Sequence, residues 1–295
     1  MSESYDSLRK KIEGAGALES VVRTMKALAA SSIGQYERAT ASLTDYYRAV
    51  ELGLYVCFRQ AGAIGFPNGS GRVQSGTLGA VVFGSDQGLV GQFNDVLADF
   101  VQKTLKALPG KKRIYAVGER IHSQLADVGL PATRLYPVPN SVRAITPLVG
   151  QILVDAEAQA GDGAAETLYL FHHRPTAGAA YEPVSELLLP LDEKWRQSLE
   201  MQKWPTKNLP QAIGSVEKAL LALVHEYLFS ALFRACAESL ASENASRLAA
   251  MQRAEKNIGE LLEGLTQSYH RLRQDAIDEE LFDLIAGFEA LRKGK

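Results

Sequence analysis

The chain opens with a long stretch in which apolar residues recur every three or four positions. The steps average about 3.5 residues, which is the period of helices paired in a coiled coil rather than of a lone surface helix. The recurring positions are Leu8, Ile12, Ala15, Leu18, Val22, Met25, Ala29, Ile33 and Tyr36. The pattern continues to about Phe58, so residues 1–60 are predicted to form one long helix that pairs with another.

The last stretch of the chain has the same period. No proline follows residue 210, and the recurring apolar positions are Met251, Ala254, Ile258, Leu261, Leu265, Tyr269, Leu272 and Ala276. Residues 211–295 are therefore predicted to form a second long helix, antiparallel to the first. At about 1.5 Å per residue, the first helix ends opposite roughly residue 268, which leaves about 20 C-terminal residues without a partner from the same chain.

Between the two helices the pattern changes to short β-rich runs. These runs are LGAVVFG, RIYAVG, TRLYPV, TLYLFHH and SELLLPL, all within residues 77–191. Segments with helical spacing, such as Asp95–Leu108 and Ser141–Ala160, lie between them. Residues 61–76 are rich in Gly, Ser and Pro and are predicted to be a linker, and the polar residues 192–210 a connector. The predicted fold class is α/β: a long antiparallel coiled coil with an inserted three-layer, Rossmann-like α/β domain whose sheet is mainly parallel.

The unpaired C-terminal end carries apolar side chains at helical spacing. They are Ile277, Leu281, Leu284, Ile285 and Phe288. Because an apolar stripe of this kind marks a protein contact, we expect another protein to enclose this end. Arg273 and Gln274 lie just before the stripe, where guanidinium donors suit an acidic partner; a solvated polar band is the alternative.

Composition limits the classes of function. Lys and Arg total 32 against 34 for Asp and Glu, and this near balance argues against nucleic-acid binding. No apolar run approaches the roughly 20 residues of a membrane span, and no signal peptide is evident, so we expect an intracellular protein that reaches a membrane only through partners. Cys57 and Cys236 lie among apolar residues and are interpreted as small apolar side chains rather than metal ligands.

The loop Ser85–Asn94 follows the first β-rich run, where open α/β sheets commonly bind ligands. An enzyme would use Asp86 there as a nucleophile or metal ligand. The glycines at 84, 88 and 91 do not give the G-x-G-x-x-G spacing, however, and G-x-x-x-x-G-K-[ST] does not occur. A structural turn or a protein contact is therefore favoured over a nucleotide site, and no cofactor or metal is expected.

Two polar features are interpreted as solvent-facing. His172 and His173 are neighbours on a predicted strand, so their side chains point to opposite faces and do not share a metal ion. We interpret them as surface or edge residues. The block Ser242–Arg247 is interpreted as a solvated helix face with an ion pair between Glu243 and Arg247.

Three segments resemble the gamma subunit of F-type ATP synthases. SLRKKIEGAGALESVVRTMKALAASSI resembles its N-terminal helix, GSDQGLVGQFN its S-D-R-G-L-C-G-x-x-N loop, and ESLASENASRLAAMQRAEKNIGELLEGLTQSYHRLRQDAIDEELFDLIAG its C-terminal helix. The loop departs from the family at Gln87, Val90, Gln92 and Phe93, so family contacts are not transferred to its residues Asp86, Gln87, Gly88, Gly91 and Asn94. The paired-cysteine insert of the chloroplast type is absent, which indicates a bacterial form.

The resemblance implies a non-catalytic central rotor shaft. Such a shaft couples ion flow through a membrane ring to ATP synthesis or hydrolysis in catalytic beta subunits. The implied partners are the alpha and beta subunits, the epsilon subunit and the membrane c-ring, and the implied location is the cytoplasmic face of the bacterial inner membrane.

The resemblance also implies roles for particular residues. Arg273 and Gln274 would hydrogen-bond an acidic beta-subunit loop, and Arg23, Met25 and Lys26 would face the acidic torque-bearing loop. The bearing surface would comprise Ile277, Leu281, Leu284 and Phe288. Two alternatives stay open: a non-rotary coiled-coil scaffold that displays a flavodoxin-like interaction domain, and a hydrolase built on Asp86.

Overall fold

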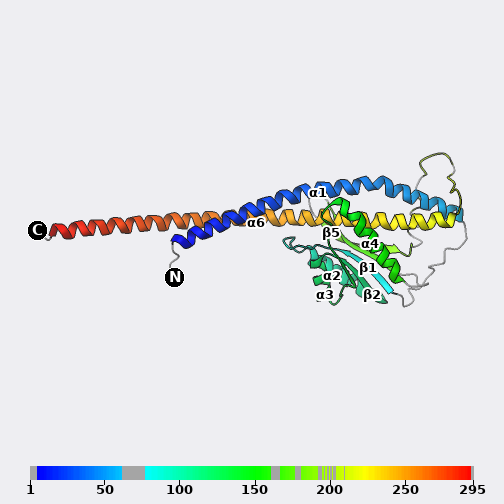
Figure 1. Ribbon diagram of the computed structural model, residues 1–295, viewed down its shortest axis with the longest axis horizontal. Helices are drawn as coiled ribbons and strands as arrows, with labels where there is room; N and C mark the ends of the chain where they lie inside the picture. Colours follow the sequence, from blue (N-terminus) through cyan, green and yellow to red (C-terminus); the bar gives the residue numbers. More distant parts are fainter. Residues whose placement is uncertain are drawn as a thin grey trace. The chain divides into compact units, whose positions relative to one another are not determined.

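The computed structural model (Figure 1) describes most of the chain: residues 5–61, 77–160, 167–176, 181–191 and 210–293, with individual positions between 195 and 208. The chain divides into two compact units, Met1–Ala29 with Leu248–Lys295 and Ala30–Arg247. Two long helices run through both units, α1 (Tyr5–Ala61) and α6 (Val216–Lys293). Both helices that the apolar pattern predicts are therefore present.

The larger unit, Ala30–Arg247, is built on one five-stranded sheet with the strand order β3-β2-β1-β4-β5. The strands are β1 (Thr77–Phe83), β2 (Lys111–Val117), β3 (Arg134–Tyr136), β4 (Thr167–Pro175) and β5 (Tyr181–Leu189). β1 is parallel to β2 and β4, and β2 is parallel to β3, whereas β5 is antiparallel to β4. Each β-rich run of the sequence forms a strand, and the mainly parallel sheet is confirmed.

Helices cover both faces of this sheet (Figure 1). One face packs against α2 (Phe93–Lys106) and α3 (Glu119–Asp127). The other packs against α4 (Val142–Ala160) and against the parts of α1 and α6 that belong to this unit. Strands buried on both faces are apolar at nearly every position, as the burial of all β1 residues after Thr77 illustrates. The predicted three-layer α/β arrangement is confirmed.

The smaller unit is a pair of antiparallel helices. Lys26 on α1 pairs with Glu255 on α6, while Tyr5 at the start of α1 stacks on Tyr269 farther along α6, with ring centroids 4.5 Å apart. Low residue numbers on one helix thus meet high numbers on the other. Because Tyr5 is the first described residue of α1, the described pairing ends at Tyr269, next to the end predicted near residue 268.

Two positions of the predicted coiled-coil seam are wrong within the described α1–α6 pairing, and a third, Ala276, is exposed beyond it. The side chains of Leu18 and Leu261 are 60% and 54% exposed. The half-buried neighbours are Glu19 and Leu262, so the seam takes the adjacent residue at each point. A coiled-coil seam alternates steps of three and four residues, and the apolar pattern alone does not fix where each step falls.

One described helix, α6, is apolar enough by composition to cross a membrane. An 18-residue window in it has a mean hydropathy of 1.4, and 44% of that window is buried inside the protein. Buried apolar residues of α6, including Ala231, Leu232 and Cys236, belong to the core on the sheet. Packing against the sheet accounts for this composition, as it does in core helices generally.

Candidate functional site

The far end of α6 carries the largest group of predicted contact residues. Large apolar side chains there are about half exposed or more, a set we call the C-terminal apolar surface: Ile277, Leu281, Phe282, Leu284 and Ile285. Leu284 is 72% exposed and Phe282, which the sequence analysis missed, is 69% exposed. The side chain of Phe288 lies outside the described residues. These side chains all come from α6 and together form an exposed apolar surface.

Arg273 and Gln274 precede this surface and are both exposed. They lie on the part of α6 beyond Tyr269, where the described pairing with α1 ends. Their donors are thus available to an external acceptor. The structure places them beside the C-terminal apolar surface, and their proposed bond to an acidic loop stays a prediction.

A second apolar face, missed in the sequence, lies on α1. Leu18, Val21 and Leu28 are 60%, 56% and 64% exposed. Residues separated by three and seven positions share one side of a helix, so these three form a stripe outside the seam. The stripe was detectable as a second three-four pattern, but Leu18 had been assigned to the seam. We call it the outer face of α1.

The predicted N-terminal contact residues differ in their exposure. Arg23 is exposed, whereas Met25 and Lys26 are half-buried. Lys26 Nζ lies 2.5 Å from Glu255 Oε2, and Arg23 Nη2 lies 2.8 Å from Glu19 Oε1. Both cations therefore already have carboxylate neighbours within the chain, and the role of all three residues in partner contact stays a prediction.

In the loop after β1, the carboxylate of Asp86 accepts hydrogen bonds from backbone N–H groups on both of its oxygens. Its Oδ1 accepts the N–H of Glu119, the first residue of α3, at 2.9 Å, and its Oδ2 accepts the N–H of Val138 at 2.9 Å. A carboxylate at a helix N-terminus satisfies a donor that the helix leaves unpaired. Asp86 is thus a structural cap that joins three segments, and this arrangement supports the structural-turn interpretation over the hydrolase.

Asn94 fixes the same loop from its other end. Its Oδ1 accepts the N–H of Ser85 at 3.0 Å, and its Nδ2 donates to Ser85 Oγ at 2.8 Å. Gly91 adopts a positive φ of 58°, which favours glycine. Gln87 is exposed and Gly88 is half-buried, with Gly88 close to the Arg120 guanidinium. The loop is therefore a hydrogen-bonded connection between β1 and α2.

The interpretation of the block Ser242–Arg247 as a solvated helix face is wrong: residues 242–246 are buried within the larger unit, and Arg247 is half-buried. Three serine hydroxyls on one face of α6 donate to backbone carbonyls: Ser239 to Phe83 at 2.9 Å, Ser242 to His173 at 3.2 Å and Ser246 to Val90 at 2.5 Å. All three serines are buried. These carbonyls lie at the ends of β1 and β4 and in the loop after β1. The serines thus fix the register of α6 against one edge of the sheet.

The ion pair expected in this block is present but not solvent-facing. Arg247 Nη2 lies 2.5 Å from Glu243 Oε1, and the Glu243 side chain is 6% exposed. Burial raises the pKa of Glu243, although the Arg247 charge and hydrogen bond oppose this rise. The pair is therefore an internal contact whose two partners depend on each other.

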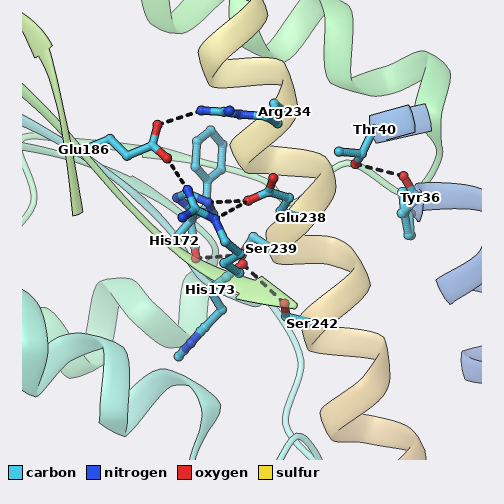
Figure 2. Close-up of polar contacts among 11 residues, drawn as sticks. Tyr36, Thr40, His172, His173, Glu186, Arg234, Glu238, Ser239 and Ser242 are labelled. Atoms are coloured by element: carbon cyan, nitrogen blue, oxygen red, sulfur yellow. Dashed lines mark hydrogen bonds and ion pairs between the residues drawn. The ribbon is translucent and has the colours of Figure 1, made fainter. Parts of the chain in front are cut away.

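His172 and His173 were wrongly interpreted as surface or edge residues. Both are fully buried, and they do point to opposite faces, as Figure 2 shows. His172 Nε2 donates to Glu238 on α6 at 2.8 Å, while His173 Nε2 donates to the carbonyl of Phe93 at the start of α2 at 2.8 Å. Each histidine therefore ties β4 to a helix layer, one on each side.

An acid–base network extends from His172 to the edge strand (Figure 2). Arg174 contacts both Glu238 and Glu186, and Arg234 lies 2.8 Å from Glu186. Burial alone would raise the pKa of Glu238, but the hydrogen bond from His172 and the charges of Arg234 and Arg174 lower it. The network pairs its charges internally and connects β4, β5 and α6.

The polar side chains of the larger unit thus act chiefly as anchors between layers. Among the residues that the structure describes, no group of three or more His, Cys, Asp or Glu is placed to hold a metal ion. The two exposed apolar surfaces described above, the C-terminal apolar surface and the outer face of α1, lie instead in the smaller unit. Both have the character of protein contacts rather than of a reaction centre.

Comparison with known proteins supplies the family. The ATP synthase family matches residues 4–291. The chain belongs to the ATP synthase gamma-chain family. The ATP synthase gamma chain of Methylibium petroleiphilum is 31% identical over 73% of this chain and 74% of the relative, and that of Leptothrix cholodnii is 26% identical over 96% and 98%. This family assignment agrees with the resemblance seen in the sequence.

Solved structures of ATP synthases share the fold of this gamma-family chain. A chain of the Euglena gracilis mitochondrial ATP synthase rotor superimposes with a TM-score of 0.61 at 19% identity, covering 92% of this chain and 98% of that one. A chain of the Tetrahymena thermophila mitochondrial central stalk and c-ring gives 0.56 at 20% identity, covering 79% and 99%. The α/β domain between two long helices is thus a shared architecture.

Proposed function

We propose that this chain is the central rotor shaft of a rotary F-type ATP synthase. The observation that carries the proposal is the C-terminal apolar surface, which follows the described end of the α1–α6 pairing and needs a protein to cover it. Family membership and the rotor and central-stalk structures with the same fold support it. The proposed sleeve is a ring of alpha and beta subunits.

The proposed mechanism is mechanical and this subunit is non-catalytic. Different sides of the shaft favour different conformations of the beta subunits, so rotation changes their nucleotide affinities through differential contact. The α/β domain would rest on the membrane c-ring with the epsilon subunit beside it. The relatives are bacterial chains, which supports a peripheral location on the cytoplasmic face of the inner membrane.

The proposed contacts use the surfaces described above. The C-terminal apolar surface and Phe288 form the bearing, and Arg273 with Gln274 bonds an acidic beta-subunit loop. Arg23, Met25 and Lys26, together with the outer face of α1, meet the torque-bearing loop. The alternatives are less well supported, because a scaffold does not require an exposed apolar helix end and Asp86 is engaged as a cap.

A matched pair of variants tests this proposal. Arg273→Ala with Gln274→Ala is compared with Gln252→Ala with Arg253→Ala, which removes the same side-chain types from exposed positions elsewhere on α6. Each charge-assisted bond lost from a desolvated contact costs about 1.5–3 kcal/mol. We expect only the first variant to lower assembly with alpha and beta subunits and ATP hydrolysis. Failure of the wild-type chain to assemble with those subunits would overturn the proposal.

A further inference from the structure

Glu255 on α6 lies beside both cationic residues of the N-terminal contact region. Its Oε2 is 2.5 Å from Lys26 Nζ, and its Oε1 is 3.7 Å from Arg23 Nε. Arg23 also contacts Glu19 one helical turn earlier, at 2.8 Å. All four residues belong to the same compact unit.

These four side chains balance in charge. Arg23 and Lys26 contribute two positive charges, and Glu19 and Glu255 contribute two negative charges. The Lys26 hydrogen bond lowers the pKa of Glu255 despite the opposing effect of desolvation, so its carboxylate is ionised at neutral pH. An anionic partner therefore meets a neutral quartet rather than two free cations.

The quartet is open to an external partner. The Arg23 side chain is 65% exposed and that of Lys26 is 33% exposed, while that of Glu255 is 26% exposed. An incoming carboxylate can reach Arg23 directly. It reaches Lys26 only in competition with Glu255, because the ammonium is already bonded to that carboxylate.

We propose that Glu255 is an internal counterion that limits how tightly Arg23 and Lys26 hold an acidic segment of an enclosing subunit. This inference rests on the proposed rotor function, since it concerns the contact that the two cations make there. A rotor must release each surrounding subunit in turn. When the acidic segment dissociates, Glu255 pairs again with Arg23 and Lys26. This internal pairing favours release of the segment, because neither cation is left without a carboxylate partner.

Neutralising Glu255 tests this role. In Glu255→Gln the two cations lose one internal anion, so an acidic partner holds them more strongly. Exposed ion pairs are individually weak, and we expect the labelled full-length chain to exchange out of its complex with alpha and beta subunits about two to five times more slowly. The difference should vanish at about 1 M salt, where the screening length falls to about 3 Å.

Three further variants define the result. Glu260→Gln removes an exposed carboxylate from the same helix, paired with Lys256, and is expected to exchange like wild type. Glu255→Asp keeps the charge and is expected to restore the wild-type rate. Arg23→Gln with Lys26→Gln is expected to accelerate exchange.

The outcomes separate this inference from the function on which it rests. If the wild-type chain does not enter the complex, the rotor function fails and Glu255 has no such role. If wild type enters and Glu255→Gln exchanges at the wild-type rate or faster, Glu255 serves only the α1–α6 pairing. In that case the counterion role is wrong while the rotor function stands.

Discussion

Two stretches of the same helix reverse the usual relation between polarity and burial. Within residues 239–247 of α6, Ser239, Ser242 and Glu243 are buried. Within residues 277–285, Leu281 and Leu284 are exposed. The first stretch packs inside the larger unit, and the second lies in the smaller unit beyond Tyr269.

The difference between the stretches is the supply of partners. In the first stretch, the hydroxyls of Ser239, Ser242 and Ser246 each lie within hydrogen-bond distance of a backbone carbonyl, so burial does not leave these three hydroxyls unsatisfied. The exposed leucines follow the end of the described pairing with α1. On this helix, burial of a side chain therefore depends on which segments of the chain pack beside it, rather than on its polarity.

The largest expected effect comes from the same substitution, Leu→Ala, made on α6 once in the larger unit and once in the smaller unit. Leu232→Ala removes a fully buried side chain from the core on the sheet and is expected to lower the free energy of unfolding by about 3 kcal/mol. Leu284→Ala on the exposed stretch is expected to change it by less than about 0.5 kcal/mol. Urea denaturation of the two free chains measures both, and equal losses would contradict the comparison.

A second effect is a pH-dependent contribution of His173 to the free energy of unfolding, of at most about 3 kcal/mol. Burial lowers the pKa of His173 to about 4 from its ordinary value of 6.5, despite the bond to Phe93. Between these values the unfolded chain binds a proton that the folded chain does not, so stability is complete above pH 6.5 and is lost as the pH falls toward 4. The free energy of unfolding of wild type and of His173→Gln, measured at several pH values, gives this contribution of His173. Parallel pH profiles for the two chains would show that His173 does not contribute it.

Much of this arrangement was predictable because apolar periodicity reports helix pairing directly. The pattern predicted both long helices and the strands, and the end that it predicted for the pairing lies next to Tyr269, where the described pairing ends. Where two neighbours compete for the seam, as Leu261 and Leu262 do, a one-residue ambiguity persists. Which of the two leucines faces α1 depends on how the two helices are rotated against each other, and the apolar pattern of one helix does not specify that rotation.

The buried polar groups were missed because their partners are distant in sequence. Ser239 bonds a carbonyl 156 positions away and Ser242 one that is 69 positions away. A signal was nevertheless present, since these serines continue the spacing of buried residues on the same face: Leu228, Ala231, Ala235, Ser239, Ser242 and Ser246. Polar residues in phase with a core stripe indicate buried hydrogen bonds.

A smaller effect follows from removing one serine of that stripe. Ser242→Ala leaves the His173 carbonyl without this buried donor and is expected to lower the free energy of unfolding by about 1 kcal/mol. Ser268→Ala, at an exposed position on the same helix, is the matched control and is expected to have no measurable effect. Thermal unfolding of both chains makes the comparison. A loss at Ser268 as large as at Ser242 would contradict the role of the buried bond, because helix propensity alone favours alanine over serine at both positions.

The smallest expected effect on the free chain is also the one that sharpens the comparison most. Ile277→Ser with Leu281→Ser alters two half-exposed side chains beyond the described pairing, so the free energy of unfolding is expected to change by less than about 0.5 kcal/mol. If an enclosing subunit covers this surface, the same change removes apolar contact area from the complex, at roughly 25 cal/mol per Å². Co-purification with alpha and beta subunits should therefore fall while thermal unfolding of the free chain stays the same. A chain that loses stability on its own but assembles normally would indicate that the C-terminal apolar surface packs within this protein, and the two stretches of α6 would then follow one rule.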